Sequence, residues 1–220
     1  MKSHRFLSLI ASMTLLAGCP VTSIPPSLPS SRTLSEPVPE QAAGPYVHAP
    51  SKVTFPEVVA GFTRDQILRF DSAGLDVGVG YNLAELPCGA AVTVFVAPAP
   101  SMTYLMADPA AVQSTQADFL QRYFGASRAE IPKHHPGAQI LSEGPAVLRN
   151  PAERAGLRAL FSFTDVFAHI RQPVLSELDV FILQKTWFVK YRVTYPEACA
   201  AAMSPRVAAF TAAFAWPDGA

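Results

Sequence analysis

The chain has 220 residues, of which half are apolar and 15% are charged, so it can bury the core of one domain. Its 17 basic and 17 acidic residues give a formal net charge of zero at pH 7. A nucleic-acid-binding protein carries a basic excess or stripe, and an acidic tail protein carries the opposite excess. The composition therefore argues against both classes.

The first residues have the features of an export signal. Lys2 and Arg5 provide a positively charged start, and residues 6–16 form an apolar stretch. This stretch is too short to cross a bilayer of about 30 Å, which takes roughly 20 residues of helix. The run Leu16-Ala17-Gly18-Cys19 resembles a bacterial lipobox, whose cysteine receives a diacylglyceryl group and is freed by cleavage before it. An ordinary signal peptide with an incidental cysteine is the alternative.

Lipid on Cys19 would anchor the protein, because two acyl chains give stable membrane binding. Pro20 follows the cysteine. By resemblance to lipoprotein sorting in Gram-negative cells, where an aspartate at that position retains the protein in the inner membrane, Pro20 permits outer-membrane delivery. We expect a palmitate-bearing lipoprotein of the cell envelope, with membrane lipid as its partner through Cys19. In a Gram-negative host it would face the periplasm from the outer membrane.

The composition divides the chain into three parts. Residues 1–18 form the predicted signal peptide, residues 19–50 a Pro/Ser-rich tether, and residues 51–220 a single domain. Nine prolines fall between Pro20 and Pro56, with serines among them. Such a segment cannot offset its ordering entropy by burial, so it stays extended. It could also bind a partner through its prolines, although a linker is the simpler interpretation.

Alternating apolar residues predict seven strands, and two amphipathic helices accompany them. The first helix follows Asp108-Pro109, and the last is capped by Ser204-Pro205 and stopped by Pro217. Short links favour antiparallel pairing, and the helices must cover the sheet. We therefore predict the α+β class, with a mostly antiparallel sheet covered by two amphipathic helices. The strands are predicted at residues 61–71, 75–82, 90–97, 138–149, 157–168, 174–184 and 187–195.

Two of these strands have faces of different character. In residues 75–82, Gly78 and Gly80 lie opposite the apolar face and leave room for a helix, a backbone or a ligand. In residues 187–195, the face opposite Trp187 carries Phe188, Lys190, Arg192 and Thr194.

A ligand surface, if the domain has one, is expected beside the two glycines. Its candidate polar contacts are Arg64, Asn82 and Arg192. Cross-strand pairing on a solvated face explains the charges on the strands more simply than an acid/base pair does. Those charges belong to Asp71, Asp76, Glu177, Asp179, Arg64, Arg69, Lys190 and Arg192.

Three segments resemble the PsbP-like group. They are Phe55-Pro56 with Val59-Ala60-Gly61-Phe62, residues 76–82, and residues 187–196 before the last helix. That group contains α/β/α sandwiches, among them the extrinsic photosystem II subunit and small bacterial envelope lipoproteins. The resemblance covers most of residues 52–217. It implies an α/β/α sandwich with a binding or assembly role more than catalysis, and it transfers no functional residue.

Two cysteines remain once Cys19 is assigned to lipid. Cys88 and Cys199 belong to an exported domain, where oxidation is favoured. A disulfide between them would close a loop of about 110 residues and stabilise the fold. Two buried free thiols are the alternative. A catalytic cysteine is the weakest interpretation, because Cys88 has no histidine near it in sequence.

The pair His134-His135 could bind a transition metal with help from Glu130 or His169. Adjacent side chains usually diverge, however, and no metal-binding spacing occurs. A solvated loop is the preferred interpretation, so we predict no metal and no cofactor. The sequence also lacks a Gly-x-Ser-x-Gly elbow, a Walker loop and a complete dinucleotide loop, and it assigns no catalytic residue.

These observations favour a lipid-anchored, non-catalytic envelope protein that binds an envelope protein partner or assists an envelope assembly. The alternative is a small-molecule or metal carrier that uses a concave face of the sheet. A hydrolase comes third. A pocket with converging polar groups would favour the carrier, and a nucleophile hydrogen-bonded to a histidine would favour the hydrolase.

Overall fold

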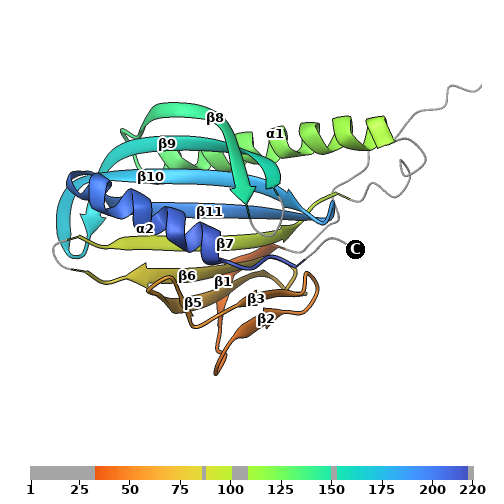
Figure 1. Cartoon of the computed structure of the whole chain (residues 1–220), viewed down its shortest axis with the longest axis horizontal. Helices are drawn as coiled ribbons and strands as arrows, with labels where there is room; N and C mark the ends of the chain where they lie inside the picture. Colours follow the sequence, from red (N-terminus) through yellow and green to blue (C-terminus); the bar gives the residue numbers. More distant parts are fainter. Residues whose placement is uncertain (1–32, 86–87, 101–108, 150–152, 218–220) are drawn as a thin grey trace, which may run out of the picture.

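The computed structural model describes residues 33–85, 88–100, 109–149 and 153–217. Its strands are β1 (Thr33–Glu40), β2 (Tyr46–His48), β3 (Val53–Phe55), β4 (Val58–Val59), β5 (Phe62–Asp71), β6 (Val77–Leu83), β7 (Ala90–Pro98), β8 (Gln139–Arg149), β9 (Glu153–Phe167), β10 (Ile170–Leu183) and β11 (Trp187–Pro196). Its helices are α1 (Pro109–His134), the 3-10 turn η2 (Glu197–Cys199) and α2 (Ala200–Ala213). One antiparallel sheet has the order β1-β5-β6-β7-β11-β10-β9-β8, with β4 paired to β5, and β2 and β3 form a separate pair (Figure 1).

A tight hairpin connects the two longest strands. Phe167 pairs with Ile170, so Ala168 and His169 form the turn between β9 and β10, with φ values of 48° and 67°. A turn whose two central residues have positive φ has a backbone twist that matches the twist of the two strands that it joins. Glycine or asparagine usually occupies such positions. The sequence pattern predicts the start of the second strand at residue 174, whereas the strand begins at Ile170.

The sheet carries one helix on each face. Met203, Val207 and Phe210 of α2 join a core with apolar side chains of β5, β6, β7, β8 and β11. On the other face, Phe124 and Ile131 of α1 pack against β9 and β10. Figure 1 shows α2 lying across the sheet, while α1 runs beside β9 and β10 and projects past them at one end.

Aromatic rings fix α2 on the sheet. The ring of Phe210 has its centroid 5.0 Å from that of Phe62, 5.2 Å from Tyr81, 6.0 Å from Phe214 and 6.5 Å from Tyr191. All five side chains are buried. Tilted and edge-to-face ring pairs add to the stability gained from buried apolar area. Phe210 is therefore the central contact between α2 and the sheet.

The predicted α/β/α sandwich of the PsbP-like type is wrong, because the sheet dominates this fold. β8, β9 and β10 have 11, 15 and 14 residues, whereas α1 buries only three side chains along its 26 residues. α2 contacts both β8 and β11, although β10 and β9 lie between them in the sheet. The sheet therefore curves around α2, as Figure 1 shows. This curvature covers apolar surface that two helix layers were expected to cover.

The sheet starts upstream of residue 51, where the sequence analysis placed the start of the domain. β1 pairs with β5, from Thr33 opposite Asp71 to Glu40 opposite Ile67. β2 also lies within the segment taken as tether, and it pairs with β3. Residues 1–32, which include the predicted signal peptide and Cys19, lie outside the described residues.

Candidate functional site

The three residues predicted to contact a ligand do not meet in one site. The Arg64 guanidinium is committed to the backbone, because it donates to the carbonyl oxygens of Phe55 (2.9 Å), Ala42 (3.0 Å) and Gly44 (2.7 Å). Exposed Asn82 shares a pocket of about 370 Å³ with Arg64, where β5 begins and β6 ends. Arg192 lines a different pocket.

Neighbouring side chains fill the space beside the two glycines of β6. A Cβ atom on Gly78 would come 3.0 Å from ring atoms of Phe70 and Phe95. A Cβ atom on Gly80 would come 3.1 Å from Cγ of Gln66. The glycines therefore allow side chains of β5 and β7 to pack against the backbone of β6, and they admit no ligand there.

Lys190 and Arg192 lie on the face of the sheet that α1 covers. They are two residues apart on β11, so their side chains point to the same face. With α1 they line a pocket of about 340 Å³, here called the Lys190–Arg192 pocket. Its other lining residues are Phe95, Ser127, Glu130, Ile131, His134, His135, Leu178 and Thr194. This pocket brings charged, hydroxyl and apolar groups together.

Aromatic rings surround the ammonium group of Lys190. Its Nζ lies 4.1 Å from the centroid of the Phe95 ring and 5.9 Å from that of Tyr123. Tyr123 stacks on Phe188, with centroids 4.1 Å apart and an interplanar angle of 7°. The faces of such rings attract a cation, but they also exclude water from it. Burial accordingly lowers the pKa of Lys190, while attraction by Asp76 opposes the shift.

Arg192 lies beside a second aromatic pair. Its guanidinium carbon is 6.0 Å from the centroid of Phe163, on which the ring of His135 stacks at 4.2 Å. His135 Nδ1 is 3.0 Å from Asp165 Oδ2, so Nδ1–H donates to the carboxylate. The second ring nitrogen, Nε2, takes no part in this contact. Burial lowers the pKa of Arg192 to about 10, which leaves its guanidinium charged at neutral pH.

The described carboxylates do not pair directly with these two cations. In the part of the chain that the structure describes, neither Lys190 nor Arg192 has an Asp or Glu oxygen within 4.0 Å. Asp76 attracts Lys190 from farther away, and burial raises the pKa of Asp76 to about 6. Glu130 is engaged by Lys133 at 2.6 Å. Two neighbouring, partly buried cations with no direct counter-charge favour the binding of an anion.

The acidic residues of β10 show the opposite arrangement. Arg158 Nε donates to Asp179 Oδ1 at 2.7 Å, and the Arg158 guanidinium also lies 3.7 Å from Glu177. Tyr195 donates to Glu177 at 2.9 Å. Asp179 is only 5% exposed, whereas the Arg158 side chain is 49% exposed, so this cross-strand pairing joins a buried carboxylate to a half-exposed guanidinium and is not fully on a solvated face. These carboxylates are compensated, whereas the cations of β11 have no carboxylate partner at ion-pair distance among the described residues.

The two adjacent histidines point to different partners. His134 Nε2 is 3.7 Å from Glu130, and His135 bonds to Asp165. His169, the other histidine considered as a ligand, lies in the β9–β10 turn. Within the described ranges, no three His, Cys, Asp or Glu side chains form a group that could hold a metal ion.

One serine hydroxyl is hydrogen-bonded to a histidine, as a hydrolase would require. Ser51 Oγ is 2.6 Å from His48 Nδ1, and His48 Nε2 is 2.9 Å from the carbonyl oxygen of Gly74. A carbonyl oxygen only accepts, so Nε2 carries the proton and Ser51 donates to Nδ1. His48 is 1% exposed and Ser51 0%. The pair therefore fastens the β2–β3 segment and is out of reach of a substrate.

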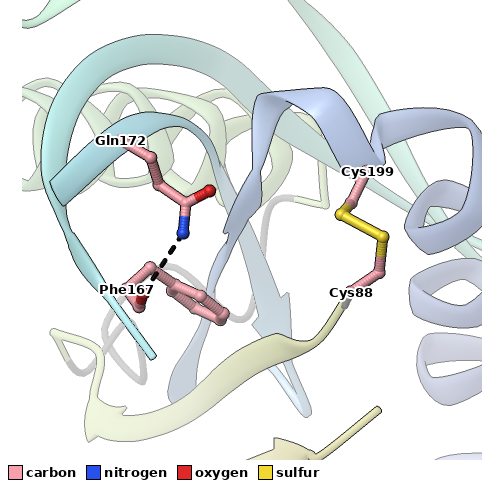
Figure 2. The surroundings of a disulfide bond; sticks show 4 residues. All are labelled: Cys88, Phe167, Gln172 and Cys199. Carbon is pink, nitrogen blue, oxygen red and sulfur yellow. Dashed lines mark hydrogen bonds between the residues drawn. A yellow bond between two sulfur atoms is a disulfide. The ribbon is translucent and has the colours of Figure 1, made fainter. Parts of the chain in front are cut away.

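Cys88 and Cys199 form a disulfide at one end of the sheet, with their Cα atoms 5.6 Å apart. Figure 2 shows that the bond ties the segment before β7 to the turn before α2. The β9–β10 hairpin lies beside it, where Gln172 Nε2 donates to the carbonyl oxygen of Phe167 at 3.2 Å (Figure 2). A mostly apolar groove of about 1020 Å³ lies between the disulfide and this hairpin.

Sequence reasoning found Arg192 but missed its neighbour Lys190, which it assigned to pairing on a solvated face. A signal was present, because the alternation in residues 187–195 places both cations on the face of Phe188. A face that carries a large aromatic residue next to a predicted helix is expected to be covered. The absence of a paired carboxylate depends on strand order and could not be inferred from the alternation.

Comparisons with known proteins give no further guide: no family model, curated protein or solved structure matches this chain. None of the helices in the described ranges is long and apolar enough to span a membrane.

Proposed function

We propose that this chain is a lipid-anchored protein of the cell envelope whose domain binds a small anionic ligand in the Lys190–Arg192 pocket. One observation carries the proposal: two neighbouring cations face one pocket, and within the described residues neither has a carboxylate at ion-pair distance. A charge withdrawn from water is costly unless an opposite charge or hydrogen bonds compensate it. A bound anion would supply that compensation to both side chains.

A small ligand fits this site better than a protein partner does. The pocket volume of about 340 Å³ lies within the usual range for small-molecule sites. Phe95, Ile131 and Leu178 offer apolar contacts beside the charged groups. Such a combination of apolar walls and a few polar groups is typical of small-molecule pockets.

The proposal is for binding without catalysis. Ser127 contributes a hydroxyl to the pocket, but it has no hydrogen bond to a base among the residues that the structure describes. A serine nucleophile needs such a base. Among the described serines, the one with a histidine partner is Ser51, which is buried elsewhere. A carrier domain therefore accounts for the arrangement better than a hydrolase.

The binding test compares Arg192→Met with the wild-type full chain, using calorimetric titration with benzoate and phenyl phosphate at pH 7. We expect wild type to bind at least one of these anions saturably and Arg192→Met to lose tenfold or more in affinity, because a charged hydrogen bond is worth about 1.5–3 kcal/mol. Arg171→Met is the matched control, since Arg171 is exposed on β10 and does not line the pocket. Equal affinities in wild type and Arg192→Met would contradict the proposal.

The anchor is tested separately with Cys19→Ala in the full chain. We expect wild type to sediment with membranes and to carry acyl chains detectable by mass spectrometry. The variant should move to the soluble fraction, because no cysteine remains at the lipobox. Cys88→Ala serves as the control and should keep the lipid. An unlipidated wild type, or a variant that stays in the membrane fraction, would overturn the anchor.

A further inference from the structure

We infer that the Lys190–Arg192 pocket takes a phosphoryl group, specifically that of a phosphate monoester with a small apolar or aromatic body. This inference rests on the proposed anion-binding function and names the class of ligand. Three features support it: the number of uncompensated cations, the number of hydrogen-bond donors, and the apolar wall.

The charge of a phosphate monoester matches the two cations of β11. A phosphate monoester carries about −1.5 to −2 charges at pH 7, whereas a carboxylate carries one. Lys190 and Arg192 are both without a directly paired carboxylate in the described part of the chain. A monocarboxylate would compensate only one of them. A dianion between them would also favour the charged form of Lys190, whose pKa burial lowers.

Donors from separate elements can reach several phosphate oxygens. Lys190 and Arg192 come from β11, and the hydroxyl of Ser127 comes from α1. Ser127 makes no hydrogen bond with another described residue, so its proton is available. His135 adds no donor at pH 7.5, because burial lowers its pKa and its Nδ1–H donates to Asp165, which leaves Nε2 of the neutral ring as an acceptor. A carboxylate has only two oxygens to accept from these groups, whereas a phosphoryl group has three.

Thr194 does not add to this donor set. Ser176 Oγ donates to the carbonyl oxygen of Val193 at 2.9 Å, so its single proton is used there. The 3.1 Å contact between Ser176 and Thr194 then requires Thr194 to donate. Its proton points to Ser176 and not to the pocket. Ser127 is therefore the hydroxyl expected to contact the phosphoryl group.

Four groups near the pocket oppose an anion: the carboxylates of Asp76, Asp165 and Glu130, and the carboxyl end of α1. Asp76 attracts Lys190 from beyond ion-pair distance, and Asp165 accepts from His135 Nδ1–H at 3.0 Å. Glu130 holds a negative charge, but Lys133 lies 2.6 Å from its carboxylate and lowers its pKa. The carboxyl end of α1 carries the negative pole of the helix, and one of its last carbonyls, that of Ile131, accepts from His135 N at 2.9 Å. Lys190 and Arg192 have no comparable partner among the described groups, so the net effect favours an anion.

An apolar wall indicates what the phosphoryl group is attached to. Leu178 and Ile131 are 1% and 3% exposed, and the Phe95 ring lies beneath the Lys190 ammonium. These side chains line the same pocket as the cations. An aromatic or short aliphatic group on the phosphate would pack against them. Inorganic phosphate lacks this contact and should bind more weakly.

The test is calorimetric titration of the full chain at pH 7.5 and fixed ionic strength with phenyl phosphate, benzenesulfonate and benzoate. We expect phenyl phosphate to bind at least tenfold more tightly than either of the other two. Benzenesulfonate has the tetrahedral shape but a single charge, so it separates charge from geometry. Ser127→Ala should weaken phenyl phosphate several-fold and leave benzoate unchanged, while Ser142→Ala, an exposed serine on β8, should change neither.

The outcomes separate this inference from the proposed function. If benzoate or benzenesulfonate binds as tightly as phenyl phosphate, the phosphoryl assignment is overturned and the anion pocket stands. If none of the three anions binds, the proposed function is overturned together with the assignment. If phenyl phosphate binds tightly but Arg192→Met and Ser127→Ala leave its affinity unchanged, the anion binds elsewhere and both are overturned.

Discussion

Replacing Cys88 and Cys199 with serine is expected to lower the free energy of unfolding by about 4 kcal/mol. The disulfide joins residues 111 positions apart, so it restricts a large part of the unfolded chain. In the chain-entropy model, a loop of about 100 residues contributes close to 5 kcal/mol, and native-state effects usually reduce the measured value. It also holds the turn before α2 next to the segment before β7, where the groove lies.

Urea denaturation of oxidised wild type and of the double variant measures this difference. Both should carry Cys19→Ala, so that the third cysteine forms no new pair. A reductant should destabilise the wild type and leave the double variant unchanged. Equal denaturation midpoints for the two oxidised proteins would show that the disulfide does not stabilise the domain.

Phe210→Ala is expected to cost about 3–5 kcal/mol, the usual cost of truncating a buried phenylalanine. Phe210 is 0% exposed and its ring contacts those of Phe62 and Tyr81. These rings belong to β5 and β6, so the variant would leave a cavity between α2 and the sheet. Because α2 also contacts β8, the loss should weaken the curved part of the sheet.

The same denaturation assay tests Phe210→Ala against Val166→Ala. Val166 is 59% exposed on β9, so its truncation should change stability by no more than about 0.5 kcal/mol. If the two variants were equally stable, α2 would not be fixed on the sheet as described. A variant that does not fold at all is replaced by Phe210→Leu, for which we expect a smaller loss than for alanine.

Much of the local structure could be predicted from the alternation of apolar residues. Val92, Val94 and Val96 alternate along β7, and all three are buried on the face that α2 covers. The overall class could not be predicted in the same way. Periodicity indicates which face of a strand is buried, but it carries no information on how strongly the sheet curves. The curvature decides whether helices or the sheet itself cover that face.

Long-range pairing limited the rest of the prediction. Prolines favoured an extended tether up to residue 50, yet β1 pairs with β5 from Thr33 onward. An edge strand tolerates proline where its N–H would face solvent, so Pro37 and Pro39 did not exclude a strand. Arg64 was a reasonable ligand candidate on β5, but the carbonyls that it binds belong to distant segments. Neither the β1–β5 pairing nor the hydrogen bonds of Arg64 can be inferred from the residues that neighbour them in sequence.

A crystal structure of the protein grown with phenyl phosphate tests the anion pocket most directly. We expect the phosphoryl group between Lys190 Nζ and the Arg192 guanidinium, within hydrogen-bond distance of both, and the phenyl ring against Leu178 and Ile131. An anion bound at another place, with none in the Lys190–Arg192 pocket, would contradict the proposed binding site.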